Sequence, residues 1–186
     1  IHYRLLLLFR AVNIIDRLAG LRVAGIDASS IIYLLKAGFL GYLAAEVELH
    51  TVASVMRETG WRGLPVIVDD HDNDSSALLP ADDQLLAFTT ARRLPLISED
   101  RKLLQRAKAA RLPYYNALLM VDLLVLRERF AEEEYHTYRD RLVAIGRYDA
   151  EVLEIESRVA AEVLAGRRRP GPGCNPATGT DEFSTQ

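Results

Sequence analysis

The sequence predicts an α/β fold: a parallel twisted sheet with helices on both faces, preceded by one helix and followed by a helical extension. From Leu21 onward, short apolar and β-branched runs alternate with segments of helical periodicity. This alternation is expected when parallel strands are joined by crossover helices. The chain has 186 residues, of which 49% are hydrophobic, enough for one continuous core and too few for two comfortable domains.

The central region, residues 21–130, carries this alternation. Ser29 or Ser30 is expected to cap the first crossover helix, and Thr51 is expected to cap the third, because short hydroxyl side chains accept hydrogen bonds from exposed N–H groups. The predicted strands are 22–26, 47–49, 64–68, 94–98 and 112–115, and the predicted helices are 29–38, 39–45, 51–60, 81–92, 101–110 and 117–129.

The regions on either side differ in character. Residues 1–20 place apolar side chains near helical spacing and end at Gly20, which predicts a helix that packs before the core. Residues 131–166 predict a helical extension, with helices at 132–145 and 149–164 separated by Gly146. Residues 167–186 are rich in Arg, Pro, Gly, Thr and Ser, so we expect a disordered tail there.

Composition excludes several classes of protein. A net charge of -3 does not suit a general nucleic-acid coat, so any nucleic-acid contact must be local. The single Cys174 excludes an internal disulfide and multi-cysteine metal sites, and it favours a reducing compartment, so a cytoplasmic location is expected. The apolar run from Leu5 to Phe9 is too short to span a membrane.

Acidic residues recur where the predicted strands end. Asp27 follows the first strand, Asp100 follows the strand at 94–98, and Asp82 opens the helix before that strand. Any one of these acids is explained by helix capping, but the carboxyl ends of parallel strands meet at one edge of the sheet. Clustered carboxylates repel one another, so they favour a hard cation such as Mg²⁺ or Mn²⁺.

The spacing of four short segments resembles the PIN-domain nuclease family. The run 24–32 looks like that family's opening motif, and the helical run 52–58 looks like its second motif. The segments 80–87 and 95–100 resemble the third and fourth motifs together. The resemblance covers residues 21–128, with Arg93 where the family often has glycine and Ser98 where it often has threonine.

This resemblance implies a fold, a reaction and a set of site residues. It implies an endoribonuclease that uses Mg²⁺ or Mn²⁺ to hydrolyse RNA phosphodiester bonds. The catalytic residues would be Asp27, Glu58, Asp82 and Asp100, with Asp27, Asp82 and Asp100 as metal ligands and with Ser29, Asp83 and Ser98 in support. Eighteen positions separate Asp82 from Asp100, as in the family, whereas Asp83 is seventeen away, so the spacing favours Asp82.

The resemblance also suggests partners and one alternative function. A toxin of this type would pair with an antitoxin protein, and the helices after Phe130 could form a homodimer or bind a partner. Arg101, Lys102 and Arg106 could hold the RNA backbone beside the metal, although an ordinary solvated helix face explains them equally well. The alternative is a catalytically inactive PIN-like module that acts by binding or regulating a protein.

Other candidate sites are weaker. An aspartyl-phosphate phosphotransferase would need a better placed lysine than Lys102, and the acidic stretch 69–74 lacks the glycine and final glutamate of a calcium loop. The four histidines show no metal-ligand spacing and are expected at the surface or at caps. Trp61, Tyr114 and Tyr115 could stack on bases, but aromatics near strand ends more commonly pack in the core or at its rim.

Overall fold

The computed structural model describes residues 14–69 and 79–168, with side chains as far as Gly166. Residues 14–19 are helical, in agreement with the predicted N-terminal helix. The expectations for residues 1–13, for the acidic stretch after Asp69 and for residues 169–186 of the tail lie outside the described residues. Residues 167 and 168, where the disordered tail was expected to begin, still belong to the last helix. Within residues 14–69 and 79–168, no helix combines the length and the apolar composition that a membrane crossing requires.

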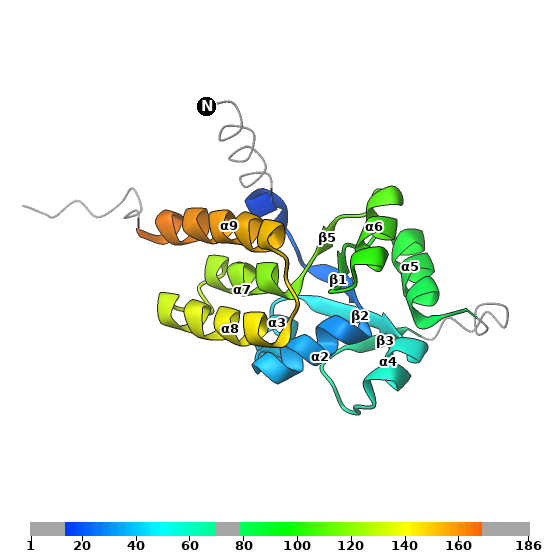
Figure 1. Cartoon of the computed structure of the whole chain (residues 1–186). Helices are drawn as coiled ribbons and strands as arrows, with labels where there is room; N and C mark the ends of the chain where they lie inside the picture. The colour runs from blue at the N-terminus through cyan, green and yellow to red at the C-terminus, as the bar shows by residue number, and fades with distance from the viewer. Residues whose placement is uncertain (1–13, 70–78, 169–186) are drawn as a thin grey trace, which may run out of the picture.

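Five parallel strands form the sheet, which confirms the predicted α/β class (Figure 1). They are β1 (Val23–Ile26), β2 (Glu48–Val52), β3 (Ile67–Asp69), β4 (Leu96–Ile97) and β5 (Tyr114–Tyr115), in the order β3-β2-β1-β4-β5. The chain builds outward from β1 to β3 and then crosses to β4 on the other side of β1. The switch in direction therefore lies between β1 and β4, where open parallel sheets bind their ligands.

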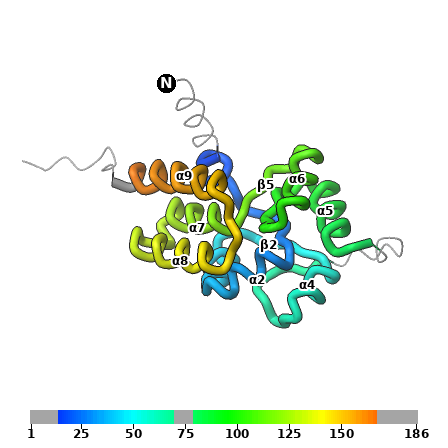
Figure 2. The backbone as a smooth tube through the Cα atoms, viewed as in Figure 1, coloured from blue at the N-terminus to red at the C-terminus, as the bar shows by residue number. Residues whose placement is uncertain are grey.

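Helices cover both faces of this sheet, as predicted. Figures 1 and 2 show α5 and α6 on one side, and α2, α3, α7, α8 and α9 on the other. The helices are α2 (Ala28–Ala37), α3 (Leu40–Ala44), α4 (Ala53–Thr59), α5 (Ala81–Arg92), α6 (Arg101–Ala109), α7 (Ala117–Leu126), α8 (Glu132–Ile145) and α9 (Ala150–Arg168).

Two predicted helix caps are wrong. The side chain that caps α2 is Asp27, which accepts a hydrogen bond from the N–H of Ser30, so Ser29 and Ser30 both lie inside the first turn. Thr51 belongs to β2, which runs on to Val52, and α4 begins without a side-chain cap. The Thr51 hydroxyl instead donates to the Ile26 carbonyl at 2.9 Å, because the neighbouring strand offers it a buried acceptor.

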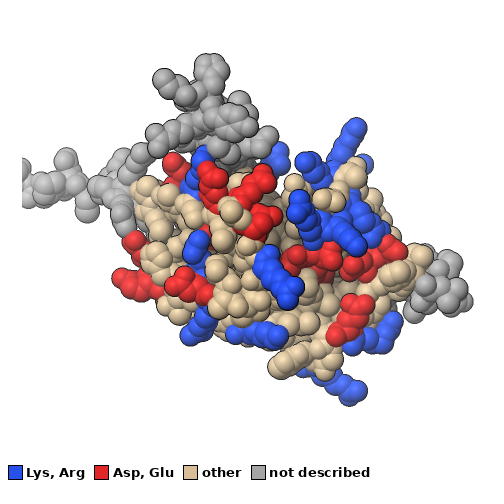
Figure 3. Space-filling model, viewed as in Figure 1, with Lys and Arg blue, Asp and Glu red and all other residues tan. Residues whose placement is uncertain are grey.

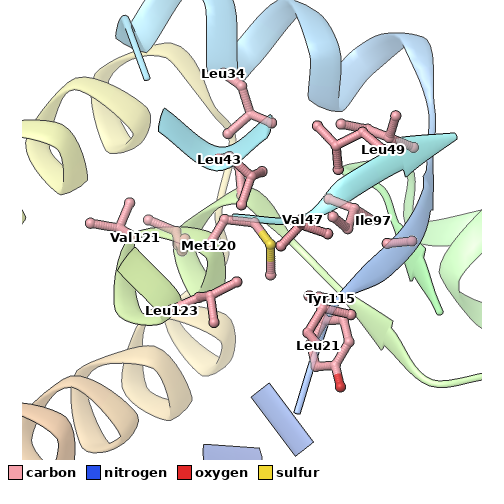
Figure 4. Close-up of a cluster of buried hydrophobic side chains, with 14 of the residues drawn as sticks. Leu21, Leu34, Leu43, Val47, Leu49, Ile97, Tyr115, Met120, Val121 and Leu123 are labelled. Carbon is pink, nitrogen blue, oxygen red and sulfur yellow. The ribbon is translucent and has the colours of Figure 1, made fainter. Parts of the chain in front are cut away.

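The main core lies between the sheet and the helices α2, α3 and α7 (Figure 4). Leu34 and Leu43 project from α2 and α3 toward Leu49 and Ile97 of the sheet, with Met120 of α7 beside them, and all five are at most 2% exposed. Eight of the ten residues of α7 are buried, as expected for a helix that is apolar on every side. Such a helix needs cover on its outer face, and α8 and α9 supply it.

On the opposite face, α5 packs against β1 because Gly25 has no side chain. A Cβ built on Gly25 would lie 2.3 Å from Cγ2 of Thr89 on α5, closer than any carbon contact allows. Thr89 is fully buried, and its hydroxyl donates to the Leu85 carbonyl of its own helix at 2.9 Å. This close approach fixes the position of α5, whose first turn carries Asp82 and Asp83.

Candidate active site

Asp27 lies directly after β1, at the switch point of the sheet, and is 2% exposed. Its Oδ1 accepts a hydrogen bond from the Ser30 N–H at 2.7 Å. Its Oδ2 accepts from the hydroxyls of Ser29 at 2.7 Å and Ser98 at 2.5 Å. Burial raises the pKa of Asp27, although these hydrogen bonds favour its charged form. Asp27 is therefore a rigidly held carboxylate, and the Ser29 hydroxyl is one of the groups that hold it.

Ser98 joins the two strands on either side of the switch point. Ile26 and Ile97 are paired in register, so the residues that follow them, Asp27 and Ser98, emerge side by side. The Ser98 hydroxyl donates to Asp27 and accepts from the Asp100 N–H at 2.9 Å. Asp100 then caps α6 by accepting from the Lys102 and Leu103 N–H groups at 2.6 and 2.9 Å. One buried hydroxyl thus positions the segments that carry Asp27 and Asp100.

The first turn of α5 presents two adjacent acids in different environments. Asp83 forms an ion pair with Arg106 of α6. Burial raises the pKa of Asp82, and the negative charges of Asp27, Asp100 and Glu58 raise it further, whereas Arg106 partly offsets them. The two neighbouring acids thus differ, because the charges of other acids act on Asp82 whereas Asp83 is paired with a cation.

Glu58 contributes to this group from α4 with an exposed side chain. A hydrogen bond of 2.9 Å between the Ser54 hydroxyl and Oε1 of Gln84 joins α4 to the first turns of α5. Although Glu58 and Asp82 come from different helices, the charge of Glu58 acts on the pKa of Asp82. We call Asp27, Glu58, Asp82 and Asp100 the acidic cluster.

Protein families, curated proteins and solved structures contain no significant match to this chain. The fold and the geometry of the acidic cluster are thus the observations on which a function can be argued.

The acidic cluster does not form a closed metal cage. Within residues 14–69 and 79–168, no three Asp, Glu, His or Cys side chains are close enough to hold one ion by themselves. Both oxygens of Asp27 already accept hydrogen bonds, although each carboxylate oxygen has a further lone pair. Mg²⁺ commonly binds through one or two carboxylates and keeps several waters. The donor set therefore fits a hydrated divalent ion and does not fit a cage of protein ligands alone.

Positive charge lies beside the acidic cluster. Figure 3 shows a band of acidic side chains over α5, with basic groups over α6 on one side and further basic side chains near α4 on the other. Arg101, Lys102 and Arg106 of α6 are all exposed. Arg106 is engaged by Asp83, and Arg101 lies 4.0 Å from Asp149, at the limit of an ion pair. The exposed Lys102, next to the Asp100 cap, is the best placed of the three to meet a phosphate.

Glu99 is a half-buried acid that the sequence patterns did not single out. Its Oε1 accepts the Ala117 N–H at 2.5 Å, which ties the start of α7 to the end of β4. Burial raises the pKa of Glu99 to about 7, and the charge of Asp27 adds to the increase, whereas the nearby Tyr148 hydroxyl and the Ala117 N–H oppose it. Its place directly before Asp100 was the available sequence signal, but only the fold shows that it turns inward.

The expectation that the histidines lie at the surface or at caps is wrong for His50, which is buried. Its imidazole is buried between Asp69 and Glu48, with contacts of 2.5 Å at Nδ1 and 2.6 Å at Nε2. Arg92 reaches the other oxygen of Asp69 at 3.0 Å. Burial lowers the pKa of His50, but the two carboxylates outweigh it and leave that pKa raised. This charged group joins the edge strand β3 to β2 and α5.

The three aromatics near strand ends differ in exposure. Tyr115 is 6% exposed and belongs to the core, as expected, whereas Tyr114 is 40% exposed. Trp61 is 56% exposed, so the prediction of core or rim packing is wrong for Trp61. Its backbone turns outward after Gly60, which has a left-handed conformation that ends α4.

Proposed function

We propose that this chain is a PIN-type endoribonuclease that hydrolyses RNA phosphodiester bonds with Mg²⁺ or Mn²⁺ bound at the acidic cluster. The observation that carries the proposal is that Asp27 and Asp100, remote in sequence, are linked at the switch point of a parallel sheet, and that their charges and that of Glu58 act on Asp82. The Ser98 hydroxyl bridges Asp27 to the Asp100 segment. The negative charges of the other three acids raise the pKa of Asp82. RNA as the substrate comes from the resemblance to the family.

The electrostatic cost of the cluster supports a cation there. Like-charged carboxylates destabilise the folded chain unless a proton or a cation neutralises them. They would also repel the phosphate of a substrate. A hydrated divalent ion would bind through one or two of the carboxylates of Asp27, Asp82 and Asp100 and keep several waters, with Glu58 at the exposed side. When bound, such an ion supplies an activated water at neutral pH and neutralises charge that develops on the phosphate.

The chain's own residues would position these groups. Ser29 and Ser98 keep Asp27 in one orientation, which lowers the reorganisation needed during reaction. The ion pair between Arg106 and Asp83 holds the first turn of α5, which also carries Asp82, against α6. Lys102 would contact a neighbouring phosphate of the RNA.

The decisive experiment replaces Asp27 by Asn in the full chain. Wild-type protein should cleave single-stranded RNA in Mg²⁺ or Mn²⁺ and not in EDTA. Asp27→Asn should abolish this activity with an unchanged circular dichroism spectrum. Asp140→Asn is the matched control, since Asp140 is a 77% exposed carboxylate on α8. Cleavage by Asp27→Asn at the wild-type rate would refute the role of Asp27.

Metal binding can be measured without activity. A ligand that binds only the folded state at 100 times its Kd stabilises it by about 2.7 kcal/mol. Saturating Mn²⁺ should therefore raise the Tm of the wild-type chain, and Asp82→Asn should reduce that increase. The same shift in both proteins would place the ion elsewhere.

A second candidate function is a catalytically inactive PIN-like module that binds or regulates a protein. The observation that favours it is the lack of a ready-made group of three metal ligands among the described residues. The helices α8 and α9 would then supply the binding surface. Calorimetry separates the two functions, because an inactive module should take up no Mn²⁺ near neutral pH.

A further inference from the structure

Trp61 is displayed on a short ordered loop where the chain leaves α4. The loop runs from Gly60 to Gly63, and these two glycines have φ of +68° and +69°, a conformation that other residues adopt only with strain. The backbone N–H of Trp61 donates to the Thr59 hydroxyl at 3.2 Å, and that hydroxyl donates to the Met56 carbonyl at 2.8 Å. The last turn of α4 therefore fixes the direction in which the loop leaves the helix.

The exposure of Trp61 is unusual for its size. Trp61 is the most exposed of the large hydrophobic side chains in the described residues, at 56%. Core packing does not account for a large aromatic surface left in water, and Trp is enriched at interfaces, where its ring offers a large apolar face. Nucleic-acid bases, which have an aromatic face, stack on such side chains without regard to sequence.

The surroundings of Trp61 match a phosphate-bearing strand. Arg57 and Arg62 on either side of it in the sequence are exposed, and neither forms an ion pair with a carboxylate that the structure describes. Arg57 belongs to α4 and Arg62 to the loop after it, and Figure 3 shows basic side chains near α4 on the side of the acidic band opposite the basic groups over α6. A strand that crosses the band could therefore meet cations on both sides of it.

The loop is also close to the acidic cluster along the chain. Trp61 is three residues after Glu58, so their Cα atoms are separated by roughly 11 Å at most. That distance spans about three stacked nucleotides at 3.4 Å each. A base on Trp61 would thus belong to the same short stretch of RNA as a phosphate at the cluster.

We propose that Trp61 stacks on a base of single-stranded RNA within a few nucleotides of the phosphate at the acidic cluster, while Arg57 and Arg62 contact the adjoining backbone. This proposal rests on the proposed ribonuclease function and adds a substrate-positioning residue to it. Single-stranded substrate follows from the stacking, because a base must be unpaired and splayed out to lie on a side chain.

The test uses the only tryptophan of the chain as its own reporter. The full-length Asp27→Asn protein, expected to bind RNA without cleaving it, is titrated with a single-stranded adenylate twelve-mer. Stacking should quench the Trp61 fluorescence in a saturable way. Anisotropy of labelled RNA then compares Trp61→Ala and Trp61→Phe in the same background. Tyr42→Ala is the control, since Tyr42 is 47% exposed on α3 and packs against Phe130 and Tyr138.

Stacking on an aromatic side chain is lost on substitution by Ala, which should weaken RNA binding about 5- to 150-fold. Trp61→Phe should recover most of the affinity, and Tyr42→Ala should bind like the parent. RNA binding that leaves the Trp61 fluorescence unchanged, together with an unchanged RNA affinity of Trp61→Ala, would overturn the role of Trp61. The ribonuclease proposal would still stand. A Trp61→Ala protein that binds RNA normally but elutes as a smaller species would assign the residue to a protein interface. If the wild-type chain neither binds nor cleaves RNA, both proposals are overturned.

Discussion

Asp122 offers a sharp test of the helical layer formed by α7, α8 and α9. Its side chain is fully buried, and neither carboxylate oxygen has a hydrogen-bond partner among the described residues. Burial raises the pKa of Asp122 well above its ordinary value of 3.8, and the negative charge of Glu156 raises it further, while Arg139 partly offsets this. Asp122 therefore stays protonated in the folded chain under conditions where the unfolded chain has lost that proton.

The sign and size of the effect follow from proton linkage. Above about pH 4 the folded state binds one more proton than the unfolded state at this site, so the free energy of unfolding falls as pH rises. The slope is about 1.4 kcal/mol per pH unit until the pH reaches the folded-state pKa. Asp122→Asn cannot ionise and keeps nearly the same shape. Its stability relative to wild type should therefore increase as the pH rises above about 4 toward the folded-state pKa of Asp122.

Urea unfolding followed by circular dichroism at pH 4.5, 5.5 and 6.5 measures this difference. Asp140→Asn on the exposed face of α8 should show no such trend. A difference between Asp122→Asn and wild type that stays constant across the three pH values would refute the reasoning. So would an Asn variant that loses stability relative to wild type as the pH rises.

Two further predictions concern His50 at the edge of the sheet and the packing of α5 against β1. Because the pKa of His50 is raised, wild type should be more stable than His50→Gln below about pH 6.5. This difference in stability should disappear as the pH rises through the folded-state pKa of His50. Urea unfolding measures the difference, and an NMR titration of the imidazole locates the pKa. Gly25→Ala should cost about 1–3 kcal/mol by forcing α5 away from β1, and adding Thr89→Ser should recover much of it in the same unfolding assay, since the colliding Cγ2 is removed.

Local sequence patterns predicted the elements well and their ends less well. The periodicity of residues 81–92 and 132–145 matched α5 and α8 to the residue. The caps of α2 and α4 were wrong, because Asp27 lies closer to the free N–H groups of α2 than the serines do, and a neighbouring strand takes Thr51. Such outcomes depend on which partner lies nearest in space, and residue type alone does not specify it.

The sequence by itself determined that parallel strands alternate with helices and that acids follow the strand ends, since both features are written in the periodicity and spacing of neighbouring residues. Only the tertiary structure decided that Asp83 pairs with Arg106, that His50 and Asp122 are buried, and that Trp61 is exposed. The physical reason is that charge environment and burial are set by side chains from other elements. Those side chains are remote in sequence and come together only in the folded chain, where β4 and β5 lie beside β1 on the side opposite β2 and β3.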